Sequence, residues 1–206
     1  MDPELHKAAT QGSVASLKKL VAKRPDILGS RTPRENTALH LAAELGHAGF
    51  AKEVLSVYDK LLVSKNADGD TPLHLAARRG KVHVAELLID HARVWPAKEG
   101  EPSPSSLESA QGPLLMGNKA GDTPLHEAVN HGRSALALKL LADEPNTGHA
   151  LNLKKQSPLH IAAREGLADV VEKIVRQPWV HERFVPSDSV SGTALHQAVL
   201  GGHTRK

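Results

Sequence analysis

The chain has 206 residues, of which 40% are apolar and 24% charged, so its composition is that of an ordinary folded protein and excludes wholesale disorder. Its 26 basic and 23 acidic residues leave a net charge of +3, and this small, scattered excess argues against a nucleic-acid-binding protein. The absence of cysteine excludes disulfides and thiolate metal sites, and no apolar stretch approaches the roughly 20 residues that span a bilayer.

A short phrase recurs along the chain and predicts a repeated helical unit. It appears in degenerate form at residues 4–9, and its clearest copy is Asp70-Thr-Pro-Leu-His-Leu-Ala-Ala77. The histidines of successive copies are separated by 34, 34, 52, 34 and 36 residues. Four of these steps lie close to a common period, and the fifth contains an insertion. The full copies occupy residues 36–43, 70–77, 122–129, 156–163 and 192–199.

Each copy has the residues expected at the two ends of a helix. In the third copy the Thr71 hydroxyl can cap free backbone N–H groups, Pro72 suits the first helical position, and Gly80 can end the helix with a positive φ. A second helix follows each glycine, with apolar residues four, eight and nine positions later, which form one stripe. These columns are Phe50, Val84, Leu136 and Val170; Leu20, Val54, Leu88, Leu140 and Ile174; and Val21, Leu55, Ile89, Leu141 and Val175.

The Thr-Pro-Leu-His tetrapeptide, the Ala-Ala pair and the glycine resemble the ankyrin repeat over nearly the whole chain. This resemblance implies an all-α ankyrin-repeat solenoid of stacked helix-turn-helix units with short β-turn fingers. We expect one domain over residues 1–206, with about five repeats and a truncated sixth. The copies depart from the family pattern at Ala38, Ala194, Val129 and Val199.

The resemblance also gives the repeat histidine a structural role, because in the family it bonds backbone groups and ties adjacent repeats together. Successive histidines would lie roughly 10 Å apart, one per layer, whereas zinc holds its ligands about 2 Å from one atom. No catalytic motif is present. We therefore expect no catalytic residue, metal or cofactor. The histidines concerned are His6, His40, His74, His126, His160 and His196.

Ankyrin proteins bind partners across the fingers and across the palm, which is the outer side of the first helix of each pair. The excess of basic residues at these finger and palm positions predicts a protein partner with an acidic segment. The alternative is that they form an ordinary solvated face. The matching finger residues are Arg34, Glu35, Asp68, Lys119, Lys154 and Lys155, and the matching palm residues are Arg78, Arg79, Asn130, His131, Arg164 and Glu165.

The step of 52 residues contains an 18-residue excess after the second helix of the third repeat. Prolines and serines dominate residues 92–116, and such a composition does not pack a core. We predict a flexible insertion. It is either a tolerated loop or a docking or phosphorylation site, for which Ser103-Pro104 is the candidate.

The opening of the chain has a narrower resemblance. Residues 1–9, 25–28, 36–47 and 66–74 resemble the N-terminal half of plant ankyrin–transmembrane proteins, among them the accelerated-cell-death family. This implies a cytoplasmic segment, itself not membrane-inserted, of a membrane-anchored defence protein. The alternative is a soluble adaptor or regulatory scaffold, either alone or joined to an enzymatic domain outside this segment.

The sixth repeat stops after its first helix and leaves Leu195, Val199 and Leu200 poorly covered, at a cost in apolar burial. We expect a fragment of a longer protein, or an end that a partner or a second copy covers by self-association.

Overall fold

The computed structural model describes residues 1–94 and 112–177. Over these residues the chain forms five consecutive pairs of α-helices and no strand. The pairs are α1 (Pro3–Gln11) and α2 (Val14–Lys23), α3 (Ala38–Leu45) and α4 (Ala48–Val57), α5 (Pro72–Arg79) and α6 (Val82–Arg93), α7 (Pro124–Asn130) and α8 (Ser134–Asp143), and α9 (Pro158–Arg164) and α10 (Ala168–Val175).

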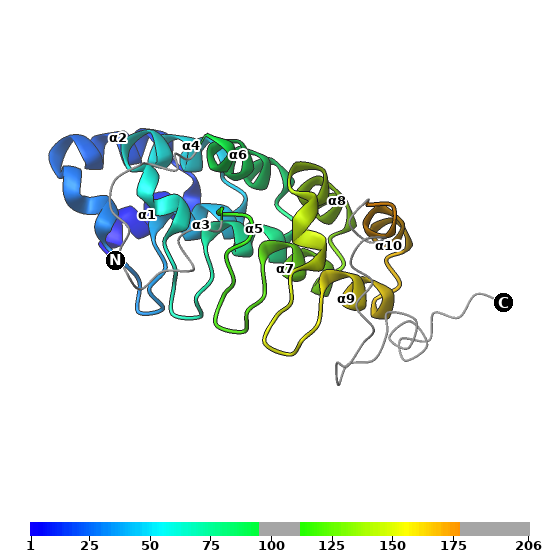
Figure 1. Cartoon of the computed structure of the whole chain (residues 1–206). Helices are drawn as coiled ribbons and strands as arrows, with labels where there is room; N and C mark the ends of the chain where they lie inside the picture. The colour runs from blue at the N-terminus through cyan, green and yellow to red at the C-terminus, as the bar shows by residue number, and fades with distance from the viewer. Residues whose placement is uncertain (95–111, 178–206) are drawn as a thin grey trace.

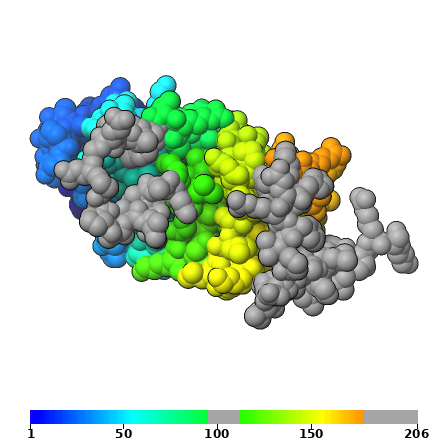
Figure 2. Space-filling model, viewed as in Figure 1, coloured from blue at the N-terminus to red at the C-terminus, as the bar shows by residue number. Residues whose placement is uncertain are grey.

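The pairs stack in chain order as two rows of helices (Figure 1). The first helices of the pairs, here called the inner helices, pack on one another as α1–α3–α5–α7–α9. The second helices, here called the outer helices, form the row along the top of the view. In the space-filling view the repeats adjoin as successive bands of colour (Figure 2). The predicted all-α solenoid of helix-turn-helix units is confirmed.

The inner helices begin and end as the repeated phrase predicts. Thr71 is the N-cap of α5, Pro72 is its first residue, and Gly80 ends it with a φ of 65°. A left-handed residue at a helix end frees its N–H to bond the last turn, and glycine adopts that conformation without a Cβ penalty. The Gly80 N–H bonds the carbonyls of Ala76 and Ala77.

The outer helices supply a large share of the apolar side chains between layers. The predicted columns are buried, with Phe50, Val84, Leu136 and Val170 in one and Leu20, Val54, Leu88, Leu140 and Ile174 in another. Each layer therefore hides the stripe of its neighbour, which a single repeat cannot do alone. In the third column Leu55, Ile89 and Leu141 are buried, Val21 is partly buried, and Val175 is exposed at the end of α10, the last outer helix described.

Within residues 1–94 and 112–177, three 3-10 helices connect outer helices to the following inner ones, and the sequence pattern did not predict them. They are η1 (Pro25–Gly29), η2 (Asp59–Val63) and η3 (Pro145–His149). Their turns bury Ile27 and Leu28 in η1, and Leu61 and Leu62 in η2, against the core. A 3-10 turn suits such a short connection, because it tightens the chain over a few residues.

The predicted insertion over residues 92–116 is too wide at both ends. Helix α6 continues to Arg93, and Ala92 is buried on it. At the other end Leu114 is buried in the core. Apolar burial thus extends the fold on both sides, while residues 95–111, which include the Ser103-Pro104 candidate, lie outside the described residues. The predicted sixth repeat, with His196, also lies outside them.

Candidate interaction surface

The repeat histidines join neighbouring layers through backbone carbonyls. The Nδ1 atom of His40 accepts a hydrogen bond from the Thr37 backbone N–H at 3.2 Å. Its Nε2 atom lies 2.9 Å from the carbonyl oxygen of Asp70, in the next repeat. Because Nδ1 accepts, the ring proton resides on Nε2 and is donated to that carbonyl. His74 and His126 repeat the arrangement with the carbonyls of Asp122 and Gln156, at 2.8 and 3.0 Å.

Burial keeps these imidazoles neutral. Desolvation lowers the pKa of His40 to about 4, although its hydrogen bond to the Asp70 carbonyl opposes the shift. Burial likewise lowers the pKa of His74 and of His126. A second proton on Nδ1 would also face the Thr37 backbone N–H, which is itself a donor. Near neutral pH these rings therefore connect neighbouring layers as uncharged side chains.

Of the two remaining predicted histidines in the described residues, His160 follows the same pattern at its Nδ1 atom, which accepts a hydrogen bond from the Ser157 backbone N–H at 3.3 Å. His6 was expected to tie layers, but its side chain is exposed. The reason is local: Asp2 caps α1, so the helix begins one residue earlier relative to the histidine than in other repeats.

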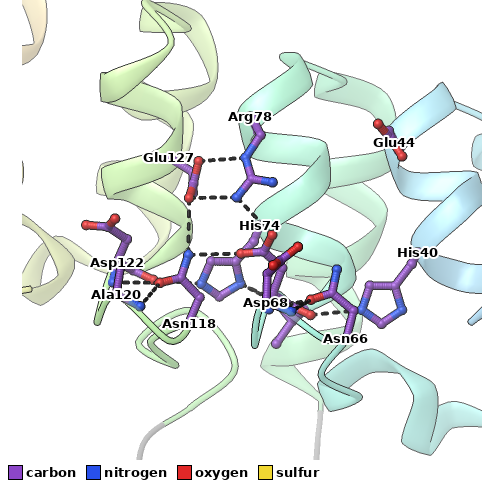
Figure 3. A network of polar contacts seen from close by, with 12 residues as sticks. His40, Glu44, Asn66, Asp68, His74, Arg78, Asn118, Ala120, Asp122 and Glu127 are labelled. Carbon is purple, nitrogen blue, oxygen red and sulfur yellow. Dashed lines mark hydrogen bonds and ion pairs between the residues drawn. The ribbon is translucent and has the colours of Figure 1, made fainter. Parts of the chain in front are cut away.

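The centre of the palm is a buried ion network between α5 and α7 (Figure 3). Arg78 donates from Nε and Nη2 to the two carboxylate oxygens of Glu127, at 2.9 and 2.8 Å. Its Nη2 also lies 2.8 Å from Asp70 Oδ2, an ion-pair distance without hydrogen-bond alignment. The side chains are 28% exposed for Arg78, 7% for Glu127 and 0% for Asp70.

The charges in this network hold one another in the ionised form. The hydrogen bonds to Glu127 raise the pKa of Arg78 despite its partial burial. Burial acts to raise the pKa of Glu127, but the hydrogen bond and the charge of Arg78 outweigh it, so the net shift is downward. One guanidinium therefore offsets two carboxylates that water scarcely reaches.

The fingers are tight turns at residues 32–36, 66–70, 118–122 and 152–156, and they hang in a row below the inner helices (Figure 1). Backbone N–H groups of Ala67, Lys119 and Leu153 each donate at 3.0 Å to a carbonyl of the preceding finger. Side chains add a second connection: Asn66 Nδ2 lies 2.9 Å from Asn36 Oδ1. Asn118 Nδ2 lies 2.9 Å from Asp70 Oδ1 and 3.2 Å from Glu127 Oε1. The fingers and the palm network thus form one bonded surface.

The predicted palm arginines already have partners within the chain. Arg79 Nη2 lies 2.6 Å from Glu44 Oε1. Arg164 contacts Glu165 Oε1 at 3.0 Å and Asn130 Oδ1 at 3.3 Å. Together with the Arg78 network, these contacts place an acceptor beside each of the three arginines. The positive bias expected in the middle of the palm is therefore largely compensated by neighbouring side chains.

The other predicted contact residues lie on the rim of this surface. His131 is exposed at the end of α7, with Nδ1 2.9 Å from the Glu127 carbonyl. The exposed finger residues are Arg34, Glu35, Asp68, Lys119, Lys154 and Lys155. Glu35 and Lys155 occupy the left-handed region, with φ of 59° and 58°, where the second and third fingers have Gly69 and Gly121. The structure thus brings the predicted finger residues to one edge of the stack.

Sequence reasoning missed the partners within the surface: Glu127, Asp70, Glu44 and the finger asparagines. Glu127 carried a usable signal, because the same position holds Leu41, Leu75 and Ile161 in three repeats, although the first and last copies have polar residues there. A carboxylate at a position that is buried and apolar in neighbouring repeats requires a cation nearby. That the cation is Arg78 depends on the stacking of α5 and α7, which lie on either side of the insertion.

The described residues contain neither a metal-binding group nor a membrane-spanning helix. Among them, no group of three or more His, Asp or Glu side chains is arranged to hold a metal ion. Their longest helix, α6, has 12 residues, and none of their helices is long and apolar enough to cross a bilayer. What the arrangement provides is a bonded, largely polar surface.

Comparison with known proteins agrees with this arrangement. A family model described as ankyrin repeats (3 copies) matches residues 5–98 and 107–180. Human transient receptor potential cation channel subfamily A member 1 is 35% identical over 91 residues, which are 43% of this chain and 8% of that protein. Alpha-latrotoxin-Lh1a from Latrodectus hasselti is 31% identical over 93 residues, which are 43% of this chain and 6% of that protein. The chain therefore covers less than a tenth of either relative.

Proposed function

The chain belongs to the ankyrin-repeat family, and on this premise we propose that its palm and fingers together form the contact surface for a protein partner. The ankyrin repeats make it a protein–protein interaction module, built on a non-catalytic fold. The observation that carries the proposal is the continuous bonding from finger to finger and from α5 to α7. A surface ordered before binding loses little conformational entropy when a partner docks.

The proposal is tested by affinity capture with matched surface variants of the whole chain. Leu45→Glu with His131→Glu places two charges at exposed positions on α3 and beside α7. Val57→Glu with Ala142→Glu places two charges at exposed positions on outer helices. Proteins retained by the wild type should be lost on the first double variant and kept on the second. Loss only on the outer-helix variant would refute this contact surface.

We propose further that the partner presents an acidic segment. The support is the net charge of +3 and the exposure of Lys119, Lys154 and Lys155 on the fingers. The palm arginines contribute less than their number suggests, because Arg78 and Arg79 each contact a carboxylate of this chain. Binding should weaken as salt rises, since salt screens exposed charges. A salt-independent affinity for a verified partner would contradict the acidic segment.

A narrower proposal makes this segment the cytoplasmic part of a plant membrane-anchored defence protein; a soluble adaptor or scaffold is the second candidate. Its support is that residues 1–9 and 66–74 resemble the N-terminal half of plant ankyrin–transmembrane proteins. Sequencing of the full-length transcript separates the two, because apolar runs of about 20 residues favour the first and their absence favours the second.

Self-association is a further proposal and rests on the poorly covered sixth repeat predicted from the sequence. Sedimentation equilibrium of the whole chain should show a dimer. A monomer at high protein concentration would refute it.

A further inference from the structure

A groove runs between the second, third and fourth fingers and η3. Its volume is about 810 Å³, and residues in the ranges 65–69, 115–123 and 146–153 line it. Leu115, Leu151 and Leu153 contribute apolar surface, whereas Lys65, Lys119 and His149 contribute basic groups. The groove adjoins the palm network through Asn118, which lines it and bonds Glu127, whereas Arg78 and Glu127 themselves do not line it.

Two exposed leucines at the start of the fourth finger give this groove an apolar wall, and the matching positions of the third finger hold no leucine. Leu151 is 58% exposed and Leu153 is 74% exposed. They are two residues apart at the start of the fourth finger, where Leu153 already belongs to the turn, and the side chains of both line the groove. The corresponding positions of the third finger hold Gly117 and Lys119. Single exposed leucines are ordinary, but several that line one groove mark a place for an apolar ligand group.

The floor of the groove is held in place by the fingers themselves. Gly69 and Gly121 both line it, with φ of 77° and 75°. A Cβ at either position would lie 2.8 Å from a backbone nitrogen of the next finger, that of Lys119 or Leu153. The same two nitrogens donate the hydrogen bonds that connect the fingers. The glycines therefore permit the close spacing that shapes the groove.

The charges in the groove select the ligand. None of the described residues that line the groove is aspartate or glutamate, whereas Lys65 and Lys119 both line it. An anionic ligand is thus complementary. Trp, Tyr and Phe are likewise missing from the lining residues that the structure describes, so these offer no aromatic platform on which nucleic-acid bases stack.

We propose that this finger groove binds an extended acidic peptide segment of a protein partner, with apolar side chains two residues apart seated against Leu151 and Leu153 and carboxylates beside Lys119. This inference rests on the proposed interaction function and names the part of the surface that receives the acidic segment. An extended chain presents alternate side chains to one side, which matches the two leucines.

The test uses the whole chain and a random library of displayed 12-residue peptides as the probe. Enriched peptides are synthesised, and their affinities are measured by fluorescence polarisation on wild type, Lys119→Glu, and Leu151→Ser with Leu153→Ser. The high exposure of the replaced side chains means that these variants should fold normally, which circular dichroism checks. Lys52→Glu and Val57→Ser, exposed on α4, are the matched controls.

We expect acidic peptides with paired apolar residues, bound at least tenfold more weakly by each groove variant and unchanged by the controls. Enrichment of peptides without acidic residues would overturn the inference, as would no enrichment. Binding that is lost with His131→Glu but kept by the groove variants would overturn it while leaving the proposed interaction function intact. Binding of a 12-nucleotide single-stranded DNA that Lys119→Glu abolishes would replace the peptide with nucleic acid.

Discussion

We predict that Arg78 and Glu127, the two hydrogen-bonded residues of the palm network, contribute unequally to the free energy of unfolding. Replacing Arg78 by Met leaves two carboxylates without a cation, and they are 7% and 0% exposed. An uncompensated buried charge costs about 3–5 kcal/mol. Replacing Glu127 by Leu removes the bidentate contact but keeps Arg78 beside Asp70 and restores the apolar residue of other repeats. We expect a loss of about 1–2 kcal/mol.

A double-mutant cycle measures the interaction itself. Arg78→Met and Glu127→Leu, singly and together, are compared by urea unfolding followed by circular dichroism, with equal slopes required before free energies are compared. The coupling free energy should be about 2 kcal/mol. Arg79→Met is the control, because its pair with Glu44 is exposed and should contribute less than about 1 kcal/mol. A coupling below about 0.5 kcal/mol, or equal costs for the two single variants, would refute the reasoning.

Three further predictions concern the layer ties and the fingers. The pKa of His40 is about 4 in the folded chain against 6.5 unfolded, so the unfolded chain takes up the proton first. Below pH 6.5 this ring alone should lower the stability by about 1.4 kcal/mol per pH unit, and His74 and His126, whose pKa values burial also lowers, should add to the loss. Thermal unfolding between pH 7 and 4.5 checks this, and His40→Gln should reduce the dependence without abolishing it. Gly121→Ala should lower the free energy of unfolding by about 2 kcal/mol, because of the left-handed φ and the close contact. Lys155→Gly should raise it by up to about 1 kcal/mol. Tm values equal to that of the wild type would contradict both expectations. Asn118→Ala removes the side-chain oxygen that accepts hydrogen bonds from two backbone N–H groups. This should cost about 2 kcal/mol and lower the urea midpoint of unfolding. An unchanged midpoint would show that the finger bonds do not stabilise the stack.

The parts of the fold that depend on short-range pattern could be predicted from the sequence. Thr71, Pro72 and Gly80 mark the two ends of α5 within ten residues, and the columns behind them repeat with the helical period. The 3-10 helices could not be found this way, because a five-residue turn such as η2 has too few residues to show a period.

The candidate site was predictable only in part, because its contacts join distant segments. Arg78 and Glu127 are 49 residues apart, and their contact requires both the stacking of α5 on α7 and the accommodation of the insertion. The repeat phrase places Arg78 at the end of its helix but gives no information about the charge opposite it. The exposure of His6 shows the converse, since a one-residue shift of the cap at Asp2 changes the role of a residue that the phrase alone assigns to layer ties.

The central claim is that this chain presents its inner helices and fingers to a protein partner. Hydrogen–deuterium exchange of the whole chain, free and bound to a verified partner, tests it most directly. We predict slower exchange in α3, α5, α7, α9 and the fingers upon binding, with α4, α6 and α8 unchanged. Protection confined to the outer helices would contradict the claim.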